Sequence, residues 1–205
     1  MASSIMARRF ESHAPQRAEH GFSIIEVMIS IAVLTVGLVS LLGVFGLAMA
    51  ATQQSQENMI AKQLADEALE SIIAARNTTQ ISWSQIWNAS SCPSSGDPST
   101  GGIFMTGLQS IYQSGADGIY GTCDDTAAGL LTLADPGPDG IYNTSDDTTI
   151  PLTNYQRSIS IASVLDANGN VVPTLRAVTI TVQYSASTTS QTQSYVLNTY
   201  ISEYP

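Results

Sequence analysis

The chain has 205 residues, with 7 basic and 17 acidic side chains and a formal net charge of -10. Beyond the first twenty residues the cations are few and scattered, which excludes sequence-independent binding to phosphates, and no nucleic-acid partner is expected. Both histidines, His13 and His20, lie in that leading segment, so histidine bases and histidine-ligated metals are excluded from the rest of the chain. We therefore predict that the protein is not an enzyme.

Residues 1–21 form a polar, basic leader, and an apolar stretch follows from residue 24 to residue 51 with Glu26 as its only charge. As a helix this stretch is about 42 Å long, enough to cross a bilayer core of roughly 30 Å. The arginines of the leader predict a cytoplasmic N-terminus by the positive-inside rule. We therefore predict a single membrane-spanning helix over residues 22–50, with the C-terminal domain outside the cytoplasm.

The helical pattern continues past the apolar stretch, because no proline occurs between Pro15 and Pro93. In residues 51–80 apolar side chains recur at spacings of three and four, which is typical of a helix with one buried face. The members of this stripe are Ala61, Leu64, Ala65, Ala68, Leu69, Ile72 and Ile73. We predict one helix from about Phe22 to about Arg76, with its second part packed against the rest of the protein.

Glu26 is a carboxylate near the start of the apolar stretch, where an unpaired charge costs at least ~2.5 kcal/mol on insertion scales. No Lys, Arg or His lies elsewhere in the stretch. The nearest potential cation is the α-amino group that a cut after Gly21 would create at Phe22. The alternative interpretation is a glutamate at the helix end whose carboxylate reaches the headgroups.

The segment Gly21-Phe-Ser-Ile-Ile-Glu26-Val resembles the type III signal of type IV prepilins. This resemblance implies that an aspartic prepilin peptidase cleaves after Gly21 and N-methylates Phe22. It also implies that Glu26 pairs with the Phe22 amine of a neighbouring subunit during assembly, and that residues 22–50 are the polymerisation helix. Residues 63–76 further resemble PilV-type minor pilins and their pseudopilin relatives.

The C-terminal region, residues 155–205, is predicted to form an antiparallel sheet. Apolar residues recur there in three segments, around 159–164, 178–184 and 195–201, and Asp166-Ala-Asn-Gly169 is typical of a hairpin turn. Residues 81–154 are loop-rich, and we expect Trp83 and Trp87 to lie in a short helix and in the core. The predicted fold class is α+β and type IV pilin-like: a long N-terminal helix packed on an antiparallel β-sheet, with a loop-rich insert.

The loop-rich region contains a repeat. Residues 115–125 and 137–147 match at an offset of 22, with eight of eleven positions identical, so we predict a shared local structure. The Asp-Gly spacing is similar to that of EF-hand calcium loops, in which oxygen ligands alternate along the chain and a glycine makes the sharp turn. The alternative interpretation is a pair of Asp-Gly turns with solvated acidic tips.

Ca²⁺ is the only candidate cofactor, and none is required by the pattern. In the second copy the candidate ligands are Asp135, Asp139, the Ile141 carbonyl, Asn143 and Asp146. The first copy offers Asp117 and Asp124, with Gln113 and Gly121 at two ligand positions, and is the poorer match.

Cys92 and Cys123 are the only cysteines, and both follow the membrane span. Because disulfides form outside the cytoplasm, we predict that these two residues are paired. Such a bond would tie the segment after the helix to the first copy of the repeat.

These features predict a structural subunit, a minor pilin of a type IV pilus or pilus-like fibre. Its expected partners are other pilin subunits, prepilin peptidase, the inner-membrane pilus assembly machinery and, before assembly, the membrane. The expected location is the inner membrane as a single-pass precursor, then a fibre at the cell surface or in the periplasm. Two alternatives stay open: a type II secretion pseudopilin, and a calcium-dependent adhesion module on a pilin anchor.

Overall fold

The computed structural model describes residues 21–89, 101–186 and 191–204. The described residues fall into two compact units, which divide between Leu47 and Ala48. The first unit holds the N-terminal part of helix α1 (Ile24–Asn77), and the second holds the remainder of α1 with all the strands. The boundaries of α1 confirm the predicted helix to within two residues at each end.

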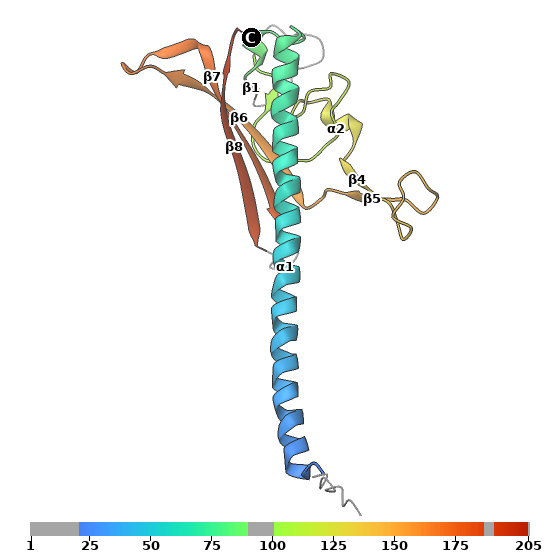
Figure 1. Cartoon of the computed structure of the whole chain (residues 1–205). Coiled ribbons are helices and arrows are strands. Elements are labelled where there is room, and N and C mark those ends of the chain that lie inside the picture. The colour runs from blue at the N-terminus through green and yellow to red at the C-terminus, as the bar shows by residue number, and fades with distance from the viewer. Residues whose placement is uncertain (1–20, 90–100, 187–190, 205) are drawn as a thin grey trace, which may run out of the picture. The chain divides into compact units, whose positions relative to one another are not determined.

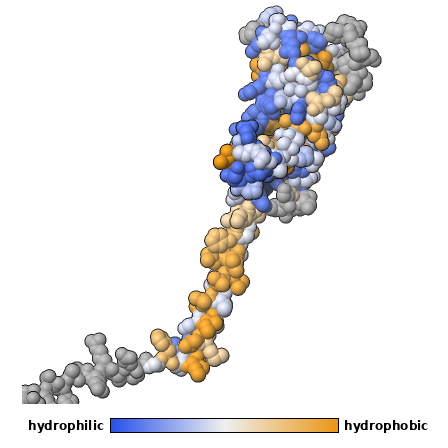
Figure 2. Space-filling view, turned by 90° about the vertical axis from the view of Figure 1, so that its right-hand side faces the viewer, coloured by the Kyte–Doolittle hydropathy of each residue, from blue (hydrophilic) through white to orange (hydrophobic). Residues whose placement is uncertain are grey.

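The N-terminal part of α1 has the properties of a membrane span. In the described part of the chain, α1 is the one helix long and apolar enough to cross a membrane, and its best 18-residue window has a mean hydropathy of 2.5. Figure 2 shows this part of the helix as a nearly continuous hydrophobic surface. Its hydroxyl groups are satisfied within the helix, since Ser30, Thr35 and Ser40 donate to carbonyl oxygens three or four residues earlier.

The second unit is built on a four-stranded antiparallel sheet in the order β3-β6-β7-β8 (Figure 1). The strands are β3 (Gln109–Ser110), β6 (Tyr155–Leu165), β7 (Val171–Ser185) and β8 (Thr192–Ser202). The predicted hairpin turn is confirmed, because Asp166 Oδ1 accepts the backbone N–H groups of Asn168 and Asn170, each at 2.8 Å. Gly169 adopts a φ of 82°, which glycine accepts without strain.

The core lies between the second part of α1 and one face of this sheet. Within the predicted stripe, Ala61, Leu64, Ala65, Ala68 and Ile72 are buried, while Leu69 and Ile73 are partly buried against the same cluster. The alanines let the helix backbone approach the sheet closely. The facing sheet residues include Ile159, Ile161, Val178, Ile180 and Val182. The alternation along β6 and β7 therefore defines which face is buried, as expected for a sheet covered on one side.

Several short elements complete the second unit. Strand β1 (Asn88–Ala89) pairs with β2 (Phe104–Met105), and β4 (Thr132–Asp135) pairs with β5 (Thr148–Pro151). A 3₁₀ helix η1 (Trp83–Gln85) and helix α2 (Asp125–Ala128) lie in the region predicted to be loop-rich.

The predicted short helix is a single 3₁₀ turn that holds Trp83, and Trp87 follows it. Both indole rings are half-buried and pack against the core cluster. Arg176 lies over both rings, with its Cζ atom 4.3 Å from the Trp83 centroid and 4.8 Å from the Trp87 centroid. Its Nη1 also donates to the carbonyl oxygens of Trp83 and Ile86. The half-buried rings therefore bind a cation by a cation–π contact.

Tyr155, at the start of β6, is a buried ionisable residue whose contribution to stability depends on pH. Its buried ring stacks on Tyr184 with centroids 5.4 Å apart, and burial, the charge of Glu57 and then Tyr184 raise its pKa to about 12. Between pH 10 and about 12 the unfolded tyrosine ionises while the folded one stays protonated, so its contribution to stability is lost as the pH rises through that window.

We therefore expect the unfolding free energy of the wild type to fall by about 2 to 3 kcal/mol more than that of Tyr155→Phe over this pH range. Urea titrations near pH 9 and near pH 12 measure the difference. Tyr200→Phe, at an exposed position on β8, serves as the control and should behave as the wild type. An equal fall in Tyr155→Phe and wild type would contradict the expectation.

Candidate functional site

The first candidate site is the segment that precedes α1. Residues 21–23 are not helical, and Phe22 is exposed. Apart from its chain neighbours, no described residue comes within 4 Å of the place where a Cβ on Gly21 would stand. The bond between Gly21 and Phe22 is therefore held in an open, non-helical segment, which is the form of backbone that a protease active site accepts.

Glu26 lies in the first turn of α1, one turn after Phe22. Both side chains line the same shallow hollow on the helix surface, together with Val27, Ser30, Ile31 and Leu34. The chain has no Lys, Arg or His from Phe22 to Ala61. A cut after Gly21 would therefore place the new amino group and the only carboxylate of the span on one apolar face.

The second candidate site is the repeat, and both copies form the same local structure. The first copy has these hydrogen bonds: Gly118 N to Gly115 O (3.1 Å), Ile119 N to Asp117 Oδ1 (2.8 Å), Gly121 N to Asp125 Oδ2 (2.6 Å) and Thr122 Oγ1 to Asp124 Oδ1 (2.7 Å). The second copy has the same bonds 22 residues later: Gly140 N to Gly137 O (3.3 Å), Ile141 N to Asp139 Oδ1 (2.8 Å), Asn143 N to Asp147 Oδ2 (2.6 Å) and Thr144 Oγ1 to Asp146 Oδ1 (2.7 Å). The predicted shared structure is confirmed.

Two positions of the repeat explain which residue types it tolerates. A Cβ on Gly115 would come within 2.2 Å of the Asp124 carboxylate, and one on Gly137 within 2.6 Å of the Asp146 carbonyl, so both copies need glycine there. At one equivalent position the first copy has Gly121, with a φ of 87°, and the second copy has Asn143, with a φ of 68°. Asparagine is one of the few side chains that accept this left-handed conformation, so the exchange preserves the loop.

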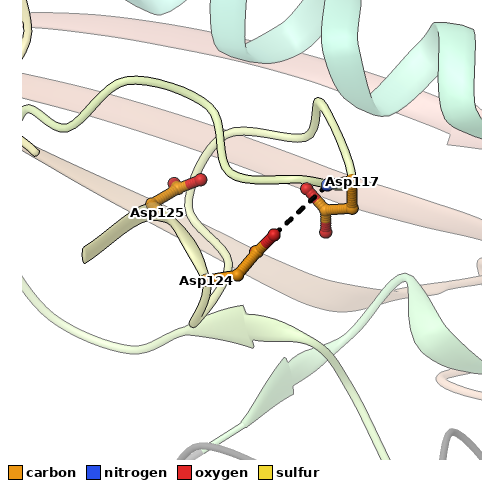
Figure 3. A group of neighbouring side chains, drawn as sticks. All are labelled: Asp117, Asp124 and Asp125. Carbon is orange, nitrogen blue, oxygen red and sulfur yellow. Dashed lines mark hydrogen bonds between the residues drawn. The ribbon is translucent and has the colours of Figure 1, made fainter. Parts of the chain in front are cut away.

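In the first copy the loop gathers three carboxylates. One oxygen from each of Asp117, Asp124 and Asp125 lies within 4.8 Å of the others, and Asp124 points toward Asp117 (Figure 3). Asp125 is buried and accepts backbone N–H groups from Gly115 (2.9 Å) and Gly121 (2.6 Å). Burial raises the pKa of Asp117 and of Asp125. This arrangement combines oxygen ligands of the type that Ca²⁺ prefers.

The structure thus brings together the predicted residues Asp117 and Asp124 and adds Asp125, which the sequence reasoning missed. The sequence contained a signal for Asp125, because an Asp-Asp pair recurs at the end of both copies. Across the described residues, this is the one group of three acidic, His or Cys side chains with that spacing, so Asp135, Asp139 and Asp146 do not form an equivalent one. Calcium binding by either copy stays a prediction.

The predicted disulfide involves a residue outside the described part of the chain. Cys92 lies between residues 90 and 100, for which the structure gives no placement, and Cys123 lies in the first copy of the repeat. Their pairing stays a prediction.

A buried arginine joins the first copy to α1 and the sheet. Arg157, on β6, is 4% exposed and donates from Nη1 to the Leu64 carbonyl oxygen of α1 at 3.2 Å. Its Cζ lies 4.9 Å from the centroid of the Tyr120 ring. Burial lowers its pKa, while the charges of Asp125 and Glu67 act in the opposite direction. Sequence reasoning had treated this residue as one of a few scattered cations.

Comparison with known proteins identifies the N-terminal segment. Residues 16–42 match a family model described as the prokaryotic N-terminal methylation motif. The match covers Gly21, Phe22, Glu26 and the first turns of α1. Neither the curated proteins nor the solved structures contain a match to the chain.

The chain therefore carries a prepilin-type methylation motif on an apolar N-terminal helix. The helix followed by antiparallel strands gives an α+β layout consistent with the pilin fold. Together these findings support a type IV pilin-like or pseudopilin precursor, a membrane-anchored structural subunit rather than an enzyme. The motif implies processing by prepilin peptidase and assembly with other pilin subunits.

Proposed function

We propose that this protein is a minor pilin, a low-abundance structural subunit of a type IV pilus or pilus-like fibre. Prepilin peptidase cleaves it after Gly21 and methylates Phe22, and the mature chain assembles through residues 22–50. The observation that carries the proposal is the methylation motif at residues 16–42 on a helix whose apolar side chains are exposed.

The exposed apolar side chains of the span explain why assembly follows membrane insertion. Lipid covers them in the precursor, and once the helix leaves the bilayer only other apolar surfaces can replace that cover. Packing against the same helix of neighbouring subunits provides such a surface. Glu26 and the Phe22 amino group then neutralise each other in a dry interior, where either charge alone would be costly.

The minor role is supported by features of the helix sequence. Residues 63–76 resemble PilV-type minor pilins. Many major pilins carry a proline about a third of the way along this helix, whereas this chain has Gly43 there, with Gly37 and Gly46 nearby. Each glycine lowers helix propensity by about 1 kcal/mol relative to alanine, so these positions soften the helix without breaking it. The resemblance also includes pseudopilins, so the decisive measurement is where the processed protein accumulates.

Quantitative mass spectrometry of fibres sheared from the cell tests the proposal through the N-terminal peptide. A trace of peptide beginning at methylated Phe22 is expected. An abundant peptide would indicate a major pilin instead, and a processed form confined to the inner membrane would indicate a secretion pseudopilin. Detection of only the uncut chain, beginning at Met1, would contradict every pilin-like function.

We also propose that the first copy of the repeat binds Ca²⁺, supported by the close approach of Asp117, Asp124 and Asp125. Ca²⁺ at a hundred times its dissociation constant should raise the Tm of the mature protein by about 5 to 10 °C. Because burial raises the pKa of Asp117 and Asp125, protons compete with Ca²⁺ for these carboxylates. The Ca²⁺-dependent rise in Tm should therefore be smaller near pH 4 than near pH 7.

The repeat supplies a matched pair of variants for this test, since Asp117 and Asp139 are equivalent positions. Asp117→Asn should abolish the Ca²⁺-dependent shift in a thermal unfolding experiment, and Asp139→Asn should preserve it. The opposite result would place the ion in the second copy, and no shift in the wild type would exclude calcium from both.

A further inference from the structure

The two copies of the repeat differ in what their Ile-Tyr pairs contact. Ile119 is 1% exposed and belongs to the core cluster, and Tyr120 is half-buried. The equivalent residues of the second copy, Ile141 and Tyr142, are 61% and 58% exposed. The same sequence in the same local conformation is therefore covered in one copy and open to solvent in the other.

The first copy shows what this pair binds. Ile119 packs in the core beside α1, the backbone N–H of Tyr120 donates to Ser71 Oγ at 3.3 Å, and the Tyr120 hydroxyl donates to Glu67 Oε1 at 2.6 Å. The acceptors are four residues apart, so they lie one helical turn apart on one face of α1. Arg157 lies over the Tyr120 ring, and the negative charge of Asp125 stabilises its guanidinium. The Ile-Tyr loop is thus a helix-docking element.

The second copy presents the same element with Ile141 and Tyr142 exposed, and none of the described residues takes the place of Glu67, Ser71 or Arg157 beside it. It lies between β4 and β5, whose exposed Leu133 and Ile150 are directly paired across the strands. We call residues 132–151 the β4–β5 arm. No Lys or Arg occurs from residue 126 to residue 156, so the arm has no cation in the position that Arg157 takes beside the first copy. A complementary surface would have to supply that cation.

We infer that the β4–β5 arm docks, through Ile141 and Tyr142, onto an α-helix of a different pilin-like subunit in the same fibre. The accepting helix presents an apolar surface for Ile141, a carboxylate and a hydroxyl one helical turn apart, and a cation beside them. These are the same groups that contact the first copy within this chain. In this chain Glu67 and Ser71 already accept hydrogen bonds from Tyr120 of the first copy, so in a second copy of this chain the same two groups are engaged. This inference rests on the proposed role as a fibre subunit.

Site-specific photocrosslinking in intact fibres tests the inference. The probe is the full chain with p-benzoylphenylalanine in place of Tyr142, and the control carries it in place of the exposed Tyr200 on β8. The Tyr142 probe should give an adduct that mass spectrometry maps to a helix of another pilin-like subunit, near an acidic and a basic residue. The Tyr200 probe should not label that helix.

A second variant tests the chemistry of the contact. Ile141→Ser should reduce the yield of the adduct by about tenfold, because it removes most of the apolar area of the contact. Exposure of Ile141 means that this change leaves the fold intact, which circular dichroism checks. An undiminished adduct would contradict the docking mode.

The outcomes separate this inference from the proposed function. If the wild type is present in fibres and the Tyr142 probe labels no helix, or labels this chain's own α1, the docking inference fails and the pilin function stands. If the wild type is absent from fibres, both fail.

Discussion

Replacing Glu26 by Gln is expected to leave processing and membrane insertion intact and to lower the amount of the protein in fibres by about a hundredfold or more. Glutamine keeps the shape of the side chain but removes the charge, so insertion into the bilayer becomes easier rather than harder. In the fibre the methylated Phe22 amine then stays charged without a partner, and a broken buried pair costs about 3 to 5 kcal/mol.

Immunoblots of the membrane fraction and of sheared fibres measure the two quantities separately. Glu70→Gln is the matched control, because it makes the same change at an exposed position of the same helix outside the span. That variant should incorporate normally. Normal incorporation of Glu26→Gln would show that the charge of Glu26 has no part in assembly.

Replacing Arg157 by Met is expected to lower the free energy of unfolding by about 3 to 5 kcal/mol. Methionine fills a similar volume, but the Leu64 carbonyl loses the donor that Arg157 adds to its helical bond, and the buried Asp125 carboxylate loses a positive charge that stabilises it. The first copy of the repeat would also lose the cation over Tyr120. Urea unfolding of the mature chain in detergent, followed by tryptophan fluorescence, measures the change.

The variant that combines Arg157→Met with Asp125→Asn separates the electrostatic part from the packing. Asparagine carries no charge that needs compensation, but it keeps only one acceptor oxygen for the N–H groups of Gly115 and Gly121, which now bond to separate carboxylate oxygens. Asp125→Asn alone therefore serves as the reference, and the double variant should lose less stability than the sum of the two single changes. Strictly additive losses would mean that Arg157 does not stabilise the charge of Asp125.

Local patterns predicted much of this protein. The boundaries of α1 lie within two residues of those expected from the apolar pattern, because helical periodicity and the absence of proline act over a few residues at a time. The motif around Gly21, Phe22 and Glu26 is contiguous, so sequence reasoning found it and the family comparison confirmed it. The hairpin turn at Asp166 depends on its own side chain and was predicted for the same reason.

The repeat separates local from tertiary effects within one chain. Matching residues predicted a shared local structure for the two copies, and the structure shows the same hydrogen bonds in both. The burial of Ile119 and the exposure of Ile141 could not be predicted from the repeat, since the two residues have nearly identical neighbours in sequence. The difference arises because one copy lies against α1 and the other lies on the β4–β5 arm.

Local sequence patterns were enough to predict the helix, its apolar span, the processing motif, the three C-terminal strands and the shared conformation of the repeat, but not the short strands β1 to β5. The partners of the buried Arg157 and the half-buried Arg176 depend on the tertiary fold. Arg157 bonds to Leu64, and Arg176 to Trp83, each across 93 residues of chain. Hydrogen bonds within a turn and the periodicity of a helix depend on adjacent residues, whereas the burial of a charge depends on which distant segments meet around it.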